Sequence, residues 1–304
     1  NFVGAEQFLL KNEENLQLFE RFKQSYENKS KEELQTLFAK VLNKGMHGLC
    51  FSPYEEGQQP GDIITEAQIR RRMEIIQPYT KWIRSFSCTD GNELIPQIAH
   101  EYGIKTMVGA WLGSDDEINK KEIANHIKIA KEGYVDLAAV GNEVMYRGDL
   151  TEDELLDFMQ QVKEAIPGIP VGYVDAYYEF SIRPRITEAC DVILANCYPY
   201  WEGCPIEYSL QHMKQMFAQA LQAGNGKKVI ISETGWPSHG TNLRGAFPSN
   251  ENAMKYFINV NKWASEEQID LFYFSSFDES WKVHHEGDVG QRWGIWDKDE
   301  KLKY

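Results

Sequence analysis

Residues 136–141, Asp-Leu-Ala-Ala-Val-Gly, form a short apolar run that leads directly into Asn142 and Glu143. Residues 192–195, Val-Ile-Leu-Ala, repeat this continuous apolar character further along the chain. Runs of this kind, without alternating polar positions, are typical of parallel strands that are covered on both faces. The two runs therefore predict a buried parallel sheet.

Eight such runs recur along the chain, about 32 residues apart, and stretches with helical spacing of apolar residues separate most of them. This spacing is the size of a strand, a crossover helix and two loops. A doubly wound open sheet also alternates strand and helix, but no Gly-x-Gly-x-x-Gly sequence follows the first run. The count therefore predicts an α/β fold consisting of a single (β/α)8 TIM barrel. The predicted strands are residues 46–51, 82–87, 105–110, 136–141, 169–174, 192–197, 228–232 and 271–275.

The chain divides into two predicted parts. Residues 1–45 lie outside the repeat and contain two predicted helices, 13–26 and 31–44, which we expect to pack on the barrel as an N-terminal helical extension. Residues 46–304 are predicted to form the barrel. Its helices are expected at residues 66–78, 92–102, 120–133, 152–166, 209–224 and 251–266.

Charge and hydropathy exclude several classes of partner. The chain has 46 Asp and Glu residues against 32 Lys and Arg residues, a formal net charge of −14, which argues against nucleic acid and anionic membranes. No stretch approaches the roughly 18 apolar residues that span a bilayer. Arg70, Arg71 and Arg72 fall within a predicted helix beside Glu66 and Glu74, so they are interpreted as a solvated face. The first residues carry neither an initiator Met nor a leader, which does not argue against secretion.

Five cysteines, at positions 50, 88, 190, 197 and 204, are too few for a disulfide framework. Cys197 and Cys204 bracket a short loop and form either a small disulfide ring or two separate thiols. The chain has no Cys-x-x-Cys or His-Glu-x-x-His spacing, and His284, His285, Glu286 and Asp288 form a polar loop, so no metal site is predicted.

Two glutamates stand at the ends of predicted strands, which is where barrel enzymes build their active sites. Glu143 follows the fourth run, and Glu233 follows the seventh. Both have an apolar strand leading in, although a buried carboxylate must be satisfied by its surroundings. Two carboxylates across a cleft can cleave a glycosidic bond, one as acid and one as nucleophile or base, and a separation of roughly 5 to 5.5 Å would give retention of configuration.

These residues resemble glycoside hydrolase family 17, the β-1,3-glucanases. The matching sequences are Gly-Asn-Glu at residues 141–143 and Ser-Glu-Thr-Gly-Trp-Pro at residues 232–237. Phe-Ser-Pro-Tyr at residues 51–54 resembles the microbial branch, and Phe-Asp-Glu-Ser-Trp-Lys at residues 277–282 resembles the acidic and basic pair of the family. The resemblance covers roughly residues 46–297.

The resemblance implies that Glu143 is the acid/base and Glu233 the nucleophile of a retaining double displacement. It also implies that Asn142 forms a hydrogen bond with the sugar 2-hydroxyl; alternatively, Asn142 is only a turn residue. Glu279 and Lys282 are implied to form a pair that supports the site; alternatively, they are a plain ion pair on the surface. Flat rings at strand ends suit the faces of glucose units. The remaining candidate substrate-binding residues are Tyr54, Asp90, Tyr173, Tyr198, Trp201, Trp236 and Trp281.

The leading hypothesis is therefore a retaining, endo-type hydrolase of β-1,3-glucan of the laminarin type, needing no metal or organic cofactor. A transglycosylase of the same family would use the same glutamates. A non-catalytic glucan-binding protein would have lost one of them, and both are present. A metal-dependent barrel hydrolase would need His and Asp at strand ends. A polymeric substrate implies a secreted, periplasmic or cell-surface protein, and we expect a monomer.

Overall fold

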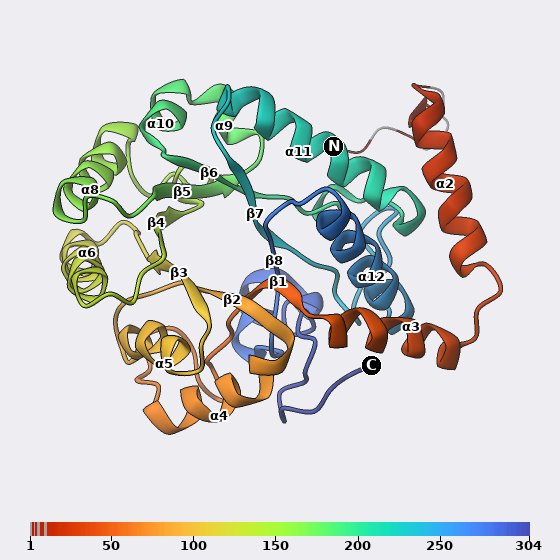
Figure 1. Ribbon diagram of the computed structural model, residues 1–304, viewed down its shortest axis with the longest axis horizontal. Coiled ribbons are helices and arrows are strands. Elements are labelled where there is room, and N and C mark those ends of the chain that lie inside the picture. Colours follow the sequence, from red (N-terminus) through yellow and green to blue (C-terminus); the bar gives the residue numbers. More distant parts are fainter. Residues whose placement is uncertain (1, 3, 5–6, 9–10) are drawn as a thin grey trace.

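The computed structural model describes residues 2, 4, 7, 8 and 11–304 and shows a closed barrel of eight parallel strands (Figure 1). Each strand pairs with its neighbours in sequence, and β1 pairs with β8 to close the ring. The (β/α)8 prediction is confirmed. The strands are β1 (Met46–Cys50), β2 (Thr80–Ser85), β3 (Lys105–Ala110), β4 (Leu137–Asn142), β5 (Val171–Ala176), β6 (Val192–Asn196), β7 (Val229–Thr234) and β8 (Leu271–Tyr273).

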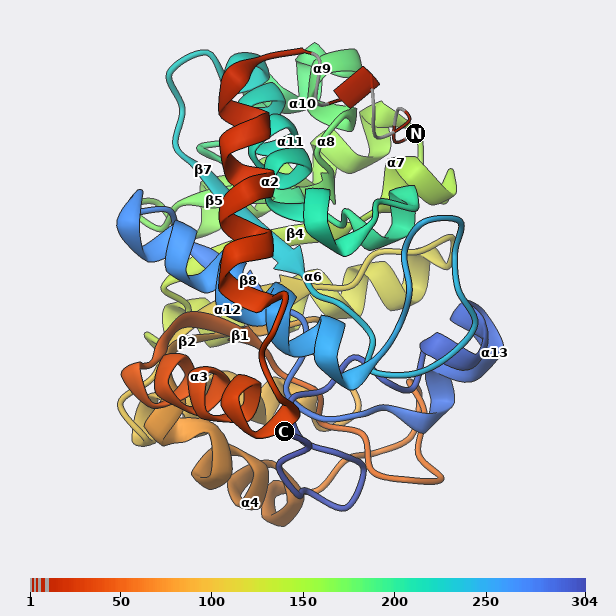
Figure 2. The ribbon, with the colours of Figure 1, turned by 90° about the vertical axis from the view of Figure 1, so that its right-hand side faces the viewer.

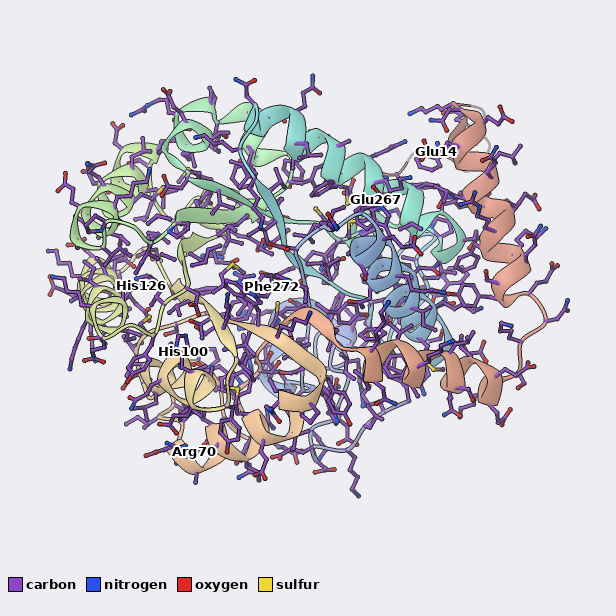
Figure 3. All side chains as sticks on the ribbon, in the orientation of Figure 1. Glu14, Arg70, His100, His126, Glu267 and Phe272 are labelled. Carbon is purple, nitrogen blue, oxygen red and sulfur yellow. The ribbon has the colours of Figure 1, made fainter. Side chains whose placement is uncertain are left out.

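Strands β4 and β6, whose apolar runs predicted a sheet covered on both faces, are buried along nearly their whole length. Every residue of β6 is buried, and in β4 only the last residue, Asn142, is partly exposed. Inside the barrel, Phe272 is 1% exposed, and a Cβ at Gly48 would lie 2.5 Å from its ring. Figure 3 shows Phe272 near the centre of the molecule, whereas Arg70 lies at its lower edge. The barrel is thus a filled core, as in other barrels of this class.

The helices surround the sheet, as the amphipathic stretches predicted. Thr151 forms a capping box with Glu154 at the start of α8, so the local start signal of that helix is confirmed. The α-helices after β1 are α4 (Glu66–Ile76), α5 (Ile95–Glu101), α6 (Asp116–Lys131), α7 (Val144–Arg147), α8 (Glu152–Ala165), α9 (Glu179–Ile182), α10 (Pro184–Ala189), α11 (Ser209–Gly224), α12 (Asn250–Glu266) and α13 (Val283–Glu286). The 3-10 turns are η1 (Gln77–Tyr79), η2 (Asn92–Leu94), η3 (Tyr200–Glu202), η4 (Ile206–Tyr208), η5 (Ser280–Lys282) and η6 (Gly287–Val289).

No helix was predicted after the fifth and eighth runs, and at these two places the structure departs from one long helix after each strand. Two short helices, α9 and α10, connect β5 to β6. After β8, residues 274–304 are all described, and their longest α-helix is the four-residue α13. The side of the barrel next to β8 must therefore be covered by other parts of the chain.

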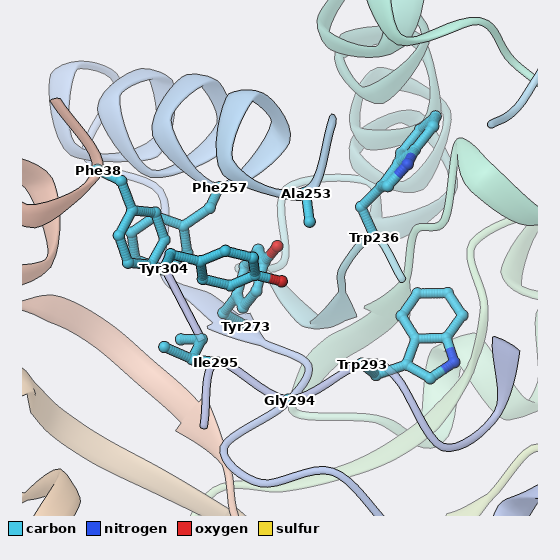
Figure 4. Close-up of a pocket in the computed structure, with 9 residues that line it drawn as sticks. All are labelled: Phe38, Trp236, Ala253, Phe257, Tyr273, Trp293, Gly294, Ile295 and Tyr304. Carbon is cyan, nitrogen blue, oxygen red and sulfur yellow. The ribbon is translucent and has the colours of Figure 1, made fainter. Parts of the chain in front are cut away.

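The N-terminal extension supplies this cover. Its helices α2 (Glu13–Tyr26) and α3 (Lys31–Lys44) have the predicted bounds. Helix α3 packs along α12, where the rings of Phe38 and Phe257 lie 4.6 Å apart. Tyr304 in the C-terminal segment packs on Phe38 at 4.9 Å. Figure 4 shows these rings packed together with further side chains, most of them aromatic.

Helix α2 stands on the outside of the molecule, in front of α11 in Figure 2. The amide of Gln211 in α11 donates to the carbonyl of Asn15 at 3.2 Å. At the other end of α2, the hydroxyl of Tyr26 donates to Asn259 of α12 at 2.6 Å. The extension is thus tied to the two helices that precede and follow β7.

The interpretation of Arg70, Arg71 and Arg72 as a solvated helix face is wrong for Arg72. Arg70 and Arg71 are partly exposed and pair with glutamates, as a solvated face requires. Arg72, in contrast, is fully buried, donates to the carbonyl of Ser52 at 2.7 Å and lies over the ring of Phe277 at 4.4 Å. It faces the core because residues in a helix point to different sides as the chain turns.

All five cysteines are free, buried thiols, so Cys197 and Cys204 form no disulfide. Cys197 belongs to the main core, and Cys204 packs with Phe8 and Tyr208. No helix in the described part of the chain combines the length and mean hydropathy needed to cross a bilayer.

Candidate active site

Glu143 and Glu233 lie at the carboxyl ends of β4 and β7, on the face of the barrel where such enzymes place their chemistry. Glu143 is half-buried and adopts a left-handed backbone conformation, with φ of 54°. Glu233 is 7% exposed. The charge of Glu233 acts on Glu143, so both carboxyl groups face one site.

Glu143 has one direct hydrogen-bond donor on a neighbouring strand. The amide of Asn196, the last residue of β6, donates to Glu143 Oε1 at 3.1 Å. Ser232 holds that amide in place by donating its hydroxyl to Asn196 Oδ1 at 2.7 Å. Burial, and then the charge of Glu233, raises the pKa of Glu143 to about 7, although the Asn196 hydrogen bond opposes this shift. Glu143 is therefore suited to hold a proton near neutral pH.

Glu233 has stronger donors on both of its oxygens. The Arg84 guanidinium forms an ion pair with Glu233 Oε2. The phenol of Tyr198 donates to Oε1 at 2.6 Å. A cation and a hydroxyl directed at the same carboxyl group are charge-assisted donors that fix its orientation. The two glutamates thus have the different environments that an acid and a nucleophile require.

Arg84 also connects the two strand ends. It lies in β2, is 1% exposed, and donates through Nη2 to Asn142 Oδ1 at 2.8 Å. Asn142 immediately precedes Glu143, so one buried guanidinium fixes Glu233 and the residue beside Glu143. The carbonyl end of Asn142 is occupied by this bond, and its amide NH2 is the end that can meet a ligand.

Four predicted residues gather where the loops after β1, β2 and β8 meet. The Tyr54 hydroxyl accepts from the Asn92 amide at 3.2 Å, and its ring lies edge-on to Trp281 at 6.1 Å. The Trp281 indole donates to Glu279 at 2.8 Å. Asp90 follows β2 in a left-handed conformation, with φ of 56°. This group forms one wall at the same end of the barrel as the glutamates.

Lys282 lies close to this wall and pairs with Glu286 of α13 at 3.7 Å. Its ammonium sits 4.0 Å from the centre of the Phe274 ring. Burial lowers the pKa of Lys282, but the charges of Glu286, Glu279 and Glu233 outweigh burial and raise it. Lys282 therefore adds positive charge near the carboxylates and is more than a surface residue.

Two of the aromatic side chains predicted to bind substrate, Trp236 and Tyr173, are too buried to stack on a sugar ring. Trp236 is 1% exposed, and its indole donates to the carbonyl of Phe247 at 3.0 Å. Tyr173 is also 1% exposed, bonds Asp175, and accepts from the backbone N–H of Met145 at 3.0 Å. In this conformation both pack beneath the site, because strand-end rings can fill the barrel as well as line its mouth.

Trp201 occupies a different place, on η3 after β6. It is 38% exposed, and its ring lies 5.5 Å from that of Trp293, which follows β8. Other exposed rings lie on the loops after β3, β4 and β7: Trp111, Tyr146 and Phe247. Flat rings thus border the mouth on several sides.

Sequence reasoning missed Arg84, Asn196 and Trp293. Arg84 had a usable signal, because an arginine near the end of an otherwise apolar strand needs a buried partner. Asn196 also had a signal, because it stands at the end of a strand, as Asn142 does. Trp293 lies outside any predicted strand, and its ring contacts with Tyr198 and Trp201 become visible only in the fold.

The described residues contain no group of three or more His, Cys, Asp or Glu side chains placed to hold a metal ion. His284 and His285 lie in α13. Asp288 accepts from the backbone N–H of Thr241 at 3.0 Å and from its hydroxyl at 2.7 Å. The Asp288 carboxylate is thus hydrogen-bonded to Thr241.

A closed parallel barrel with two differently solvated glutamates at the ends of β4 and β7 is the arrangement of a barrel glycosidase. The family model described as the BtgE/BtgC glycoside hydrolase domain matches residues 48–294. A glycoside hydrolase family 17 β-1,3-glucanosyltransferase from Rhizomucor miehei is 30% identical, with a TM-score of 0.77 over 86% of this chain and 96% of that one. The chain belongs to glycoside hydrolase family 17.

Curated relatives agree with this placement. A glucan 1,3-beta-glucosidase of Candida albicans is 29% identical over 76% of this chain and 83% of its own length. A Saccharomyces cerevisiae protein of the same description is 28% identical over 76% and 82%. An endo-laminarinase from Formosa, at 18% identity and a TM-score of 0.71, shares the fold.

Proposed function

We propose that the chain is a retaining hydrolase of β-1,3-glucan in which Glu143 is the acid/base and Glu233 the nucleophile. The observation that carries this proposal is the contrast between the two carboxyl groups. Burial and the neighbouring charge raise the pKa of Glu143 to about 7, while Arg84 and Tyr198 donate to Glu233. Glu143 can thus hold the proton of the acid, and Glu233 is held by a cation and a hydroxyl as the attacking group of a double displacement.

In the first step, an oxygen of Glu233 attacks the anomeric carbon. The bond from that carbon to the glycosidic oxygen breaks, its electron pair stays on the oxygen, and Glu143 transfers its proton there. The Tyr198 and Arg84 bonds hold the attacking carboxylate in orientation. The free NH2 of Asn142 donates to the 2-hydroxyl, a bond that strengthens in the oxocarbenium-like transition state.

In the second step, Glu143 is ionised and removes a proton from an incoming water. The water oxygen forms a bond to the anomeric carbon, and the ester bond to Glu233 breaks. The product keeps the configuration of the substrate, and both glutamates return to their starting states.

Two observations support β-1,3-glucan as the substrate class: the names of the relatives and the aromatic rings around the open end of the barrel. The two curated relatives are named for glucan 1,3-β-glucosidase, and the Rhizomucor miehei enzyme has been solved with laminaritriose. Trp201 and Trp281 are partly exposed beside the site, and such rings suit the faces of glucose units. Asp90, Glu279 and Lys282 lie where they can bind hydroxyl groups.

Digestion of linear and branched β-1,3-glucans, with products followed over time, tests this function. We expect laminari-oligosaccharides from laminarin and no release from a β-1,4-glucan. Glu143→Ala should spare substrates with good leaving groups relative to laminarin, because those leaving groups need less protonation. Equal losses on both substrates would contradict the acid role.

A second candidate, β-1,3-glucan transglycosylation, is supported by the 30% identity to a glucanosyltransferase. A sugar hydroxyl would then replace water in the second step. Chains longer than the supplied laminari-oligosaccharide at high concentration would establish transfer. Shorter products alone would leave hydrolysis as the activity.

We also infer that the chain acts outside the cytoplasm, as a secreted, periplasmic or cell-surface monomer. A polymeric glucan does not cross a membrane, so the enzyme must meet it outside. Fractionation of the producing cells, with activity assayed in each fraction, tests the location. Light scattering of the purified chain tests the monomer.

A further inference from the structure

One buried carboxylate, Glu122, lies away from the catalytic pair. Glu122 stands in α6, on the outer layer of the barrel, and is 1% exposed. The mechanism above does not use it. Burying a carboxylate is unfavourable unless hydrogen bonds replace its water, so its partners indicate what it does.

Glu122 accepts four hydrogen bonds, all from the segments that follow β2 and β3. Oε1 accepts from the hydroxyls of Ser87 at 2.5 Å and Thr89 at 2.9 Å. Oε2 accepts from the backbone N–H of Cys88 at 2.7 Å and of Trp111 at 3.1 Å. One side chain therefore joins two loops that are separate in sequence.

Two asparagines at helical spacing extend the same contact. Asn119 and Asn125 flank Glu122 by three residues on each side, so the three share one face of α6. Asn119 exchanges two hydrogen bonds with the backbone of Gly113, at 2.7 and 2.8 Å. Asn125 donates to the carbonyl of Cys88 at 2.7 Å. We call Asn119, Glu122 and Asn125 the α6 clasp.

The loops held by the clasp carry residues at the mouth. Asp90 follows the β2 segment, and Trp111, 37% exposed, begins the β3 segment. The guanidinium of Arg147 lies 4.8 Å from the Trp111 ring, and its Nη2 donates to the carbonyl of Leu112 at 3.4 Å. Arg147 ends α7, which begins directly after Glu143. The clasp is thus connected to the segment that holds the proposed acid.

We propose that Glu122 is a positioning residue that holds the β2 and β3 loops as one wall of the glucan cleft. Through it, Trp111 and Asp90 meet glucose units away from the bond that is cleaved. This inference rests on the proposed function. A simple packing role would be served by an apolar side chain, whereas four donors converging on a carboxylate fix the loops in one geometry.

Glu122→Gln tests the proposal, because the amide NH2 replaces an acceptor with a donor that faces N–H and O–H groups. We expect KM for laminarihexaose to rise about tenfold, the equivalent of one lost hydrogen bond to a charged group, with kcat within about twofold. The rise should shrink for laminaritriose. Glu117→Gln, the same change at an exposed position of α6, should leave both constants unaltered.

Two further variants separate positioning from general destabilisation. Ser87→Ala removes one donor and should give a smaller rise in KM. In a double-mutant cycle, Glu122→Gln should add less once Trp111 is replaced by Ala, because one of the two side chains that it positions is gone. Additive effects, or a loss of kcat with unchanged KM, would overturn the proposal.

The two proposals fail separately. Laminarihexaose binding can be measured by calorimetry in a Glu233→Ala background, where turnover is not needed. If the unaltered enzyme cleaves no laminari-oligosaccharide, the proposed function fails. If Glu122→Gln binds laminarihexaose as tightly as its parent, the inference about Glu122 fails alone.

Discussion

Glu143 accepts its hydrogen bond from a neutral amide, whereas Glu233 accepts from a guanidinium and a phenol. This difference at single residues is the basis of the proposed division of roles. The pKa of Glu143, about 7, places the loss of its proton near neutral pH. A general acid acts while protonated, so kcat/KM should fall as pH rises through that value.

Asn196→Ala provides the first prediction at this scale. The Asn196 hydrogen bond lowers the pKa of Glu143, so its removal should raise that pKa and move the basic limb of the kcat/KM profile to higher pH. The profile of hydrolysis against pH measures this shift. A basic limb that stays in place or moves to lower pH would show that the limb does not report the titration of Glu143.

The sequence allowed the glutamates to be predicted because their signals are local. Each follows an apolar run, and Glu233 lies in a six-residue string. The partners that distinguish the two lie far away in the chain: Arg84 is 149 residues from Glu233, and Asn196 is 53 residues from Glu143. No local pattern encodes such pairs, since only closure of the barrel brings them together.

At the scale of elements, strands and helices with strong periodicity were predicted well. Helices α2, α3 and α11 have the predicted bounds. The positions at which these helices pack were not predictable. An amphipathic face indicates that a helix packs against the protein, but it does not indicate which element it contacts. Helix α3 packs beside α12, next to the part of the barrel where no long helix follows β8 among residues 274–304.

Helix α6 contains a second buried titratable group, which leads to a prediction about stability. His126 is fully buried, its Nε2 lies 3.0 Å from the carbonyl of Val108, and burial lowers its pKa to about 4. The unfolded chain binds a proton near pH 6.5, so stability is full above that pH and falls as pH drops toward 4. The loss should be about 3 kcal/mol.

Denaturant unfolding at several pH values measures this effect. His126→Gln should flatten the decline between pH 6.5 and 4, because Gln can still donate to Val108 and does not titrate. His239→Gln, at an exposed site, should keep the decline of the parent. An equally steep decline in His126→Gln would assign the acid sensitivity to other groups.

At the scale of the whole molecule, the net charge of −14 can now be related to the proposed substrate. A neutral glucan needs no basic surface, and the charges that matter most, Arg84 and Glu233, are buried together. Salt screens exposed charges far more than buried pairs. We therefore expect kcat/KM on laminarin to change by less than about twofold between 0.05 and 0.5 M NaCl. A tenfold fall would point to recognition by surface charge.

The central claim is that Glu233 forms the bond to the sugar. Glu233→Ala should abolish hydrolysis of an activated β-1,3-glucoside while leaving oligosaccharide binding measurable. Azide has room to enter where the carboxylate stood, and it should restore turnover with a glycosyl azide of inverted anomeric configuration. Full activity of Glu233→Ala without azide, or an azide product of retained configuration, would contradict the assignment.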